Sequence, residues 1–136
     1  MADLTITAGD IIPTSNTVIA SGTAGAAITA GQPLYADASD GNKLKPAAHT
    51  NAATANVVGI AINSAPGIGQ PVDYAVSGSL AMGTILASRT VYVLGSAAGK
   101  IAPAADLSAS EFGTVLGISS STSNLKVGIV ASGVNA

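Results

Sequence analysis

The chain has 136 residues and a formal net charge of −2, and only 9% of its residues are charged, against roughly 25% in an average soluble domain. Its five basic residues are scattered, which excludes the clustered Lys and Arg that nucleic-acid phosphates require. The absence of Cys excludes disulfides and thiolate metal sites. No apolar run approaches the roughly 18 residues of a membrane span, and residues 1–20 lack a signal-peptide pattern. We therefore expect a soluble chain made in a cytoplasm, with neither nucleic acid nor membrane as a partner.

Hydrophobic residues make up 48% of the chain, but aromatic residues only 3%, and Trp is absent. Much of the apolar content is Ala, whose small side chain removes little area from water at about 25 cal/mol per Å². A core of this kind stabilises a single domain only weakly. We expect added stability from self-association or from contact with a partner surface, because few charges would have to be desolvated there.

The first 16 residues differ from the rest of the chain. Leu4, Ile6, Ile11 and Ile12 make the segment apolar, and Pro13 interrupts it. Because free tails are rarely so apolar, we interpret residues 1–16 as an extended N-terminal arm or an edge strand. Two roles stay open for it: docking onto another subunit or surface by strand addition, or pairing within its own domain as an ordinary first strand.

From residue 17 onward, short runs rich in β-branched residues alternate with Gly, Ser, Asn and Pro, which is typical of an all-β chain. Residues 40–42 predict a tight turn, and Pro46 ends the strand that follows because Pro cannot donate to a sheet. One helical turn is expected at 106–112. The expected strands are 17–20, 33–37, 43–45, 57–63, 72–76, 90–94, 100–102, 114–119 and 125–131.

Strict alternation within two of these runs predicts which side chains share a face of the sheet. The first run places Val58, Ile60 and Ile62 on one face. The second places Val72, Tyr74 and Val76 together.

The pattern of strands and turns occurs twice. The interval between matching positions is close to 57 residues (92 − 35 = 57), and two copies are too few for a solenoid. We therefore predict a single compact domain over 17–136, barrel- or sandwich-like, made of two related units of about 18–73 and 74–133. The matches are Tyr35 with Tyr92, Lys43 with Lys100, Pro46 with Pro103, Val58-Gly59-Ile60 with Leu116-Gly117-Ile118, and Val72 with Val127.

Candidate reactive groups are few. His49 is the only histidine, and no second ligand or orienting acid lies near it in the sequence. Asp37 and Asp40 superficially resemble a calcium loop, but the spacing and the missing bidentate Glu favour a hairpin turn. Asp106 and Glu111 are better explained as a helix cap and a solvated turn. We predict no catalytic, cofactor-binding or metal-binding residue, and hence no enzyme.

Four short segments, with the apolar arm before them, resemble the small capsid decoration, or cement, proteins of tailed bacteriophages from about residue 18 onward. The resemblance implies a compact β-rich domain, often a homotrimer, that binds the outside of the expanded head and bridges subunits of the major capsid protein. It carries over no functional residues. The segments are Gly-Gln-Pro-Leu-Tyr (31–35), Lys-Leu-Lys-Pro-Ala (43–47), Val-Val-Gly-Ile-Ala (57–61) and Val-Leu-Gly-Ile-Ser (115–119).

These expectations make the chain a structural protein on the exterior of a virion, made in the host cytoplasm, that stabilises the capsid lattice. The residues expected to contact the capsid or a neighbouring subunit are those of the arm: Leu4, Ile6, Ile11 and Ile12. The alternative is a β-rich receptor-binding or fibre-tip module of a virion. The 3% aromatic content disfavours this alternative, since such modules usually carry more aromatic side chains for ligand contact.

Overall fold

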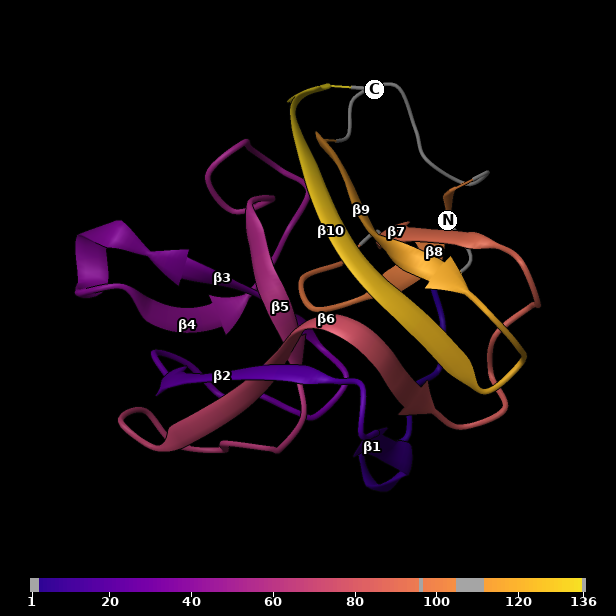
Figure 1. The fold of residues 1–136 in the computed structure, drawn as a ribbon. Coiled ribbons are helices and arrows are strands. Elements are labelled where there is room, and N and C mark those ends of the chain that lie inside the picture. The colour runs from indigo at the N-terminus through magenta and orange to yellow at the C-terminus, as the bar shows by residue number, and fades with distance from the viewer. Residues whose placement is uncertain (1–2, 96, 105–111, 136) are drawn as a thin grey trace.

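The computed structural model describes residues 3–95, 97–104 and 112–135. They form one antiparallel sheet of ten strands (Figure 1), and the all-β prediction is confirmed. The helical elements of the described residues are two short 3₁₀ turns, η1 (Ala8–Asp10) and η2 (Ala38–Asp40). The helical turn expected at 106–112 lies almost entirely outside the described residues.

Most of the ten strands coincide with residue runs that the sequence predicted to be strands. The neighbouring strands form the path β4-β3-β5-β6-β10-β9-β7-β8, while β1 and β2 pair with the opposite edge of β6. The strands are β1 (Ile11–Pro13), β2 (Val18–Thr23), β3 (Pro33–Asp37), β4 (Lys43–Pro46), β5 (Val57–Ala61), β6 (Pro71–Met82), β7 (Val91–Leu94), β8 (Ile101–Pro103), β9 (Phe112–Ser119) and β10 (Asn124–Asn135).

The strand path is symmetrical about the β6–β10 pair. On one side, the hairpin β3–β4 pairs with β5, which pairs with β6; on the other, the hairpin β7–β8 pairs with β9, which pairs with β10. Because β6 and β10 are antiparallel, this order is what two related units meeting along their last strands would give.

The residue-by-residue register differs from the expected matches in two places. Leu34 pairs with Pro46 and Gly59, whereas Tyr92 pairs with Pro103 and Gly117. The counterpart of Tyr92 is therefore Leu34, and the expected match of Tyr35 with Tyr92 is wrong by one residue. In the last strands, Tyr74 and Leu125 take equivalent places (125 − 74 = 51), so the expected match of Val72 with Val127 is also wrong.

Two bulges change the expected faces. Between β3 and β5 the pairing passes from Gly59 to Val57, so that Val58 is the extra residue. Between β2 and β6 it passes from Ser77 to Ala75, which leaves Val76 extra. An extra residue reverses the alternation beyond it. Accordingly Val76 is exposed although Val72 is fully buried.

The core draws on both halves of the sheet. Its larger cluster holds Ile60, Leu80, Tyr92, Leu116 and other buried side chains from both halves, and a smaller cluster around Ile28 and Leu34 lies within the first half. Polar groups join the halves at the margin: the Thr114 hydroxyl donates to the carbonyl oxygen of Ala55. The larger cluster therefore contains buried side chains from both halves of the sheet.

Candidate protein-contact surfaces

The four arm residues expected to make contacts have different positions. Leu4 and Ile6 are half-buried against the larger core cluster, and Ile11 is buried at 5% exposure. The Leu4 N–H donates to the carbonyl oxygen of Ile101 at 2.7 Å. Ile11 is therefore part of the domain's own core and Leu4 and Ile6 pack against it, and the contact of these residues with another subunit stays a prediction. Ile12 alone of the four is largely exposed, at 56%.

Strand geometry explains why neighbouring Ile11 and Ile12 differ. β1 pairs with the end of β6, Ile11 opposite Met82 and Ile12 opposite Ala81. Because successive side chains of a strand point to opposite faces, Ile11 joins buried Met82 inside the core and Ile12 faces outward. The segment is thus an edge strand of its own sheet, one of the two roles left open by the sequence.

The first contact surface is an apolar patch along this edge of the sheet, made of Ile12, Val18, Ile19 and Val76; we call it the β1–β2 patch. All four side chains are exposed. Val18 pairs with Ser77 and Ile19 with Ala75, so the bulged Val76 lies beside both. The turn between β1 and β2 is held down on β6, because the Thr14 and Thr17 hydroxyls both donate to the carbonyl oxygen of Ser79.

The second contact surface is an open groove over β9 and β10, which we call the β9–β10 groove. It has a volume of about 350 Å³. Val115 pairs with Val130 and Ile118 with Lys126, so each pair shares the outer face of the sheet. Glycines line the space between them. The lining residues are Val115, Gly117, Ile118, Lys126, Val127, Gly128 and Val130.

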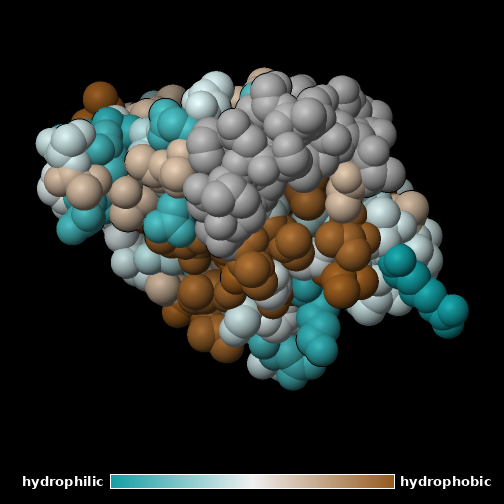
Figure 2. Space-filling view, turned by 90° about the horizontal axis from the view of Figure 1, so that it is seen from above, coloured by the Kyte–Doolittle hydropathy of each residue, from teal (hydrophilic) through white to brown (hydrophobic). Residues whose placement is uncertain are grey.

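Val18 of the first surface and Gly128 of the second share a face of the sheet, because both are cross-strand partners of Ser77, which lies between them on β6. Figure 2 shows hydrophobic side chains gathered near the middle of the view, with hydrophilic ones to the left and to the lower right. An exposed apolar area of this kind is a candidate interaction site.

A third exposed apolar side chain stands apart from these surfaces. Ile68 lies in the turn between β5 and β6 and is 72% exposed, more than any other large hydrophobic residue the structure describes. The Gln70 N–H donates to the carbonyl oxygen of Gly67, and Gly69 has a φ of +90°. The turn therefore places Ile68 at its tip, pointing away from the core.

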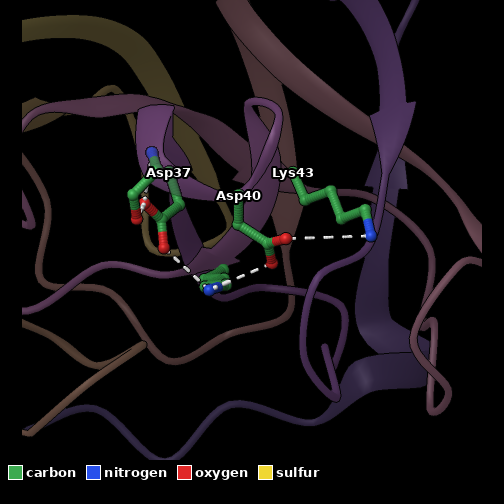
Figure 3. A network of polar contacts seen from close by, with 5 residues as sticks. Asp37, Asp40 and Lys43 are labelled. Atoms are coloured by element: carbon green, nitrogen blue, oxygen red, sulfur yellow. Dashed lines mark hydrogen bonds and ion pairs between the residues drawn. The ribbon is translucent and has the colours of Figure 1, made fainter.

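The polar hairpin between β3 and β4 holds the clustered charges (Figure 3). Lys45 Nζ lies 2.7 Å from Asp37 Oδ2 and 3.3 Å from Asp40 Oδ2, and Lys43 Nζ lies 3.8 Å from Asp40 Oδ1. Gly41 and Asn42 have φ values of 64° and 61°, the left-handed conformation that a tight hairpin turn requires. The expected turn is thus present, and the Lys45 ammonium contacts both carboxylates.

Hydrogen bonds perturb the charges of this hairpin. The Lys45 ammonium, and then the Ser39 hydroxyl and backbone N–H, donate to Asp37 and lower the pKa of its carboxyl group from 3.8 to about 2. The same contact with Asp37 raises the pKa of Lys45. Hydrogen bonds to the ionised form are the cause in both cases. The arrangement is an ion-pair network that closes a turn.

The described residues do not bring the other candidate reactive groups together. His49 lies half-buried in the 47–56 loop, and no group of three His, Cys, Asp or Glu able to hold a metal ion is found within the described part of the chain. Asp106 and Glu111 lie outside the described residues. Thr114 and Ser119 are the buried polar side chains, and each hydroxyl donates to a backbone carbonyl.

Sequence reasoning missed most of the exposed apolar residues. Val18, Ile118 and Val130 lie in the expected strands 17–20, 114–119 and 125–131, and a strand pattern alone does not say which face another element covers. The sequence feature that could have indicated these exposed residues is the pair Gly117 and Gly128, which lie near Val115, Ile118 and Val130. Glycine within a strand often marks a bulge or a close approach. The exposure of Ile68 follows from its place between two turn glycines.

Comparisons with known proteins found no matching family model, no matching curated protein and no matching solved structure. Among the described residues, no helix has both the length and the hydropathy needed to cross a membrane.

Proposed function

We propose that this chain is a structural protein of a virion, a head decoration protein that binds the outside of the expanded capsid and stabilises the lattice of the major capsid protein. The observation that carries the proposal is the β1–β2 patch, where the uncharged side chains of Ile12, Val18, Ile19 and Val76 are exposed. The resemblance of residues 31–35, 43–47, 57–61 and 115–119 to decoration proteins supplies the class of partner.

The physical basis of such a function is selective binding. A protein that binds only the expanded lattice shifts the equilibrium toward that lattice by mass action. It needs no reactive group, and it gains from a surface with few charges to desolvate. The β1–β2 patch meets this requirement, because its four apolar side chains lie along one sheet edge with Ser and Thr as neighbours.

The edge of the sheet adds a second source of affinity. Among the described strands β2 pairs with β6 alone, and the residue after it, Ala24, bridges to Leu44 of β4. The other side of β2 around Val18 and Ile19 therefore offers backbone groups to an extended segment of a partner. Strand addition of this kind combines backbone hydrogen bonds with side-chain contacts on alternate positions. In this proposal the extended segment comes from the major capsid protein, and Val18 and Ile19 are the side chains it covers.

The experiment compares variants on expanded heads that lack the protein. Val18→Asp places a charge in the β1–β2 patch at an exposed position, so the fold is retained by circular dichroism and head binding is lost. The matched control is Asp37→Asn, on the hairpin remote from the patch in the strand order, which leaves binding intact. Equal binding of Val18→Asp and the unmodified chain would contradict the proposed contact. Failure of the folded, unmodified chain to bind any expanded head would contradict the function itself.

A further inference from the structure

We infer that the capsid segment that binds along β2 carries a lysine or arginine that pairs with Asp73, and that this ion pair sets the register of the segment. The ion pair rests on the proposed function and adds to it the chemistry of the partner. Its basis is a carboxylate that the fold holds in place on the exposed face of β2 and β6, next to the β1–β2 patch.

The exposed side chains of β2 show which residues a partner strand would cover. Ile19, Ser21 and Thr23 alternate along one face of β2 and are exposed, whereas the residues between them are half-buried. Among the described strands β2 pairs with β6 alone, until Ala24 bridges to Leu44 of β4. A segment that pairs with the whole edge of β2 therefore passes Ser21.

Asp73 lies on the same face as Ser21, one strand further from the edge. Ser21 of β2 and Asp73 of β6 are cross-strand partners, and such partners share a face of the sheet. The Ser21 hydroxyl donates to Asp73 Oδ1 at 2.6 Å, and the Asp73 N–H donates to Asn63 Oδ1 at 2.6 Å. Both the side chain and the backbone of Asp73 are therefore held in place.

The Asp73 carboxylate accepts a hydrogen bond but forms no ion pair with the described residues, whose ion pairs all lie within the β3–β4 hairpin. Asp73 is exposed, so water solvates its carboxylate in the isolated chain. A partner that covers Ser21 removes part of this water. Because a carboxylate that loses water without gaining a partner costs free energy, a segment that pairs along β2 has to supply a cation at this position.

The spacing of the strands selects a long side chain for this cation. Neighbouring strands lie about 4.8 Å apart, so the backbone of an added strand would lie about 10 Å from β6, with β2 between them. Ser21 is short, and lysine and arginine carry their charge at the end of a long stem that can cross it. Ile19 is exposed and diagonal to Asp73. The segment therefore has a basic residue opposite Ser21 and an apolar residue two positions away, opposite Ile19.

Binding to expanded heads at low and at high salt tests this ion pair. Asp73→Asn removes the charge and keeps the shape, so binding at low salt should weaken about two- to fivefold, the range of an exposed ion pair. The loss should shrink at high salt, where exposed charges are screened. Asp73→Lys sets a cation against the partner's own and should weaken binding by more than about tenfold. Both variants should stay folded by circular dichroism, because Asp73 is exposed.

Two controls separate the charge of Asp73 from its surroundings. Ser21→Ala removes the hydroxyl and keeps the carboxylate, so the salt dependence of binding should persist. Asp37→Asn makes the same change of net charge on the β3–β4 hairpin and should leave binding unchanged. Equal binding of Asp73→Lys and the unmodified chain, or equal losses for Asp73→Asn and Asp37→Asn, would overturn the ion pair and leave the proposed function standing. Failure of the folded, unmodified chain to bind expanded heads would overturn both.

Discussion

Tyr92 takes the place in the second half of the sheet that Leu34 takes in the first. Each pairs with a proline of the neighbouring hairpin strand and with a glycine of the next strand, Pro46 and Gly59 for Leu34, Pro103 and Gly117 for Tyr92. Both side chains are almost fully buried. The two halves therefore use the same backbone pairing with different side chains, and the larger one fills the cluster that both halves share.

The hydroxyl group of Tyr92 stabilises the chain segment before β7. The Ala87 N–H donates to this oxygen at 2.7 Å. Tyr92→Phe removes the acceptor and keeps the ring, so we expect a loss of about 0.5 to 1.5 kcal/mol in the free energy of unfolding. The measurement is denaturant unfolding. Tyr35→Phe is the control, because Tyr35 is half-buried at an open surface pocket, and its loss should stay within about 0.5 kcal/mol. Equal losses would contradict the assigned register.

Substitutions at the neighbours Ile11 and Ile12 compare a buried position with an exposed one. Ile11→Ala leaves a cavity beside the larger core cluster, and we expect it to cost about 2 to 5 kcal/mol of unfolding free energy. Ile12→Ala should change it by no more than about 0.5 kcal/mol, since the side chain is exposed. Thermal or denaturant unfolding measures both. A small effect of Ile11→Ala would mean that the arm is not part of the core.

Two strand glycines differ in the space around them. A Cβ added to Gly117 would overlap the carbonyl oxygen of Lys126 on β10, whereas one added to Gly128 meets nothing within 4 Å. Forcing β9 and β10 apart should make Gly117→Ala destabilising by about 1 to 3 kcal/mol. Gly128→Ala should be neutral or stabilising by up to about 1 kcal/mol, because it restricts the unfolded chain. Differential scanning calorimetry measures the stability of both variants. A Gly128→Ala variant less stable than the Gly117→Ala variant would contradict the close approach of β9 and β10 at Gly117.

The ion pair of Asp37 with Lys45 predicts a dependence of stability on pH. The pKa of Asp37 is lowered in the folded chain, from 3.8 to about 2. A lowered pKa stabilises the fold above the ordinary value, and the contribution disappears as the pH falls through about 2. Asp37→Asn should therefore lower the denaturation midpoint at neutral pH and have no such effect below about pH 2.

The matched variant for this test is Lys45→Met. Because the hydrogen bond from Lys45 is the first cause of the lowered pKa, Asp37→Asn should have a smaller effect in the Lys45→Met background at neutral pH. A double-mutant cycle measures this coupling. An unchanged effect of Asp37→Asn in the two backgrounds would contradict the ion pair as its source.

Local sequence patterns predicted most of the strands. The features that these patterns did not predict depend on pairing between strands that are distant in the sequence. The runs at 33–37, 43–45, 57–63 and 90–94 fell on β3, β4, β5 and β7 because β-branched residues and turn glycines act locally. β6 is much longer than the expected 72–76. Gly78 lies within it with φ of +86°, and the backbone of Asn16 fills the place of a Cβ there. Gly78, which follows the expected strand 72–76, is therefore a point of close approach within β6.

The candidate surfaces were harder to predict for the same reason. Val76 and Val58 are bulge residues, and a bulge is decided by the pairing of two strands that are distant in the sequence. Ile11 and Ile12 could be recognised as apolar, but only their pairing with Met82 and Ala81 shows which one faces outward. The ion pair of Asp37 with Lys45, by contrast, lies within one predicted hairpin, although the cross-strand partner of Asp37 is Lys43.

The central claim is that this chain binds and stabilises an expanded capsid, and titration onto purified heads tests it most directly. The folded chain is added to expanded and to unexpanded heads that lack it, and bound copies per major capsid subunit are counted by quantitative mass spectrometry. We predict saturation at a fixed ratio on expanded heads only, together with a higher temperature of head disruption. A folded chain that leaves both kinds of head bare, or that binds without changing the disruption temperature, would contradict the claim.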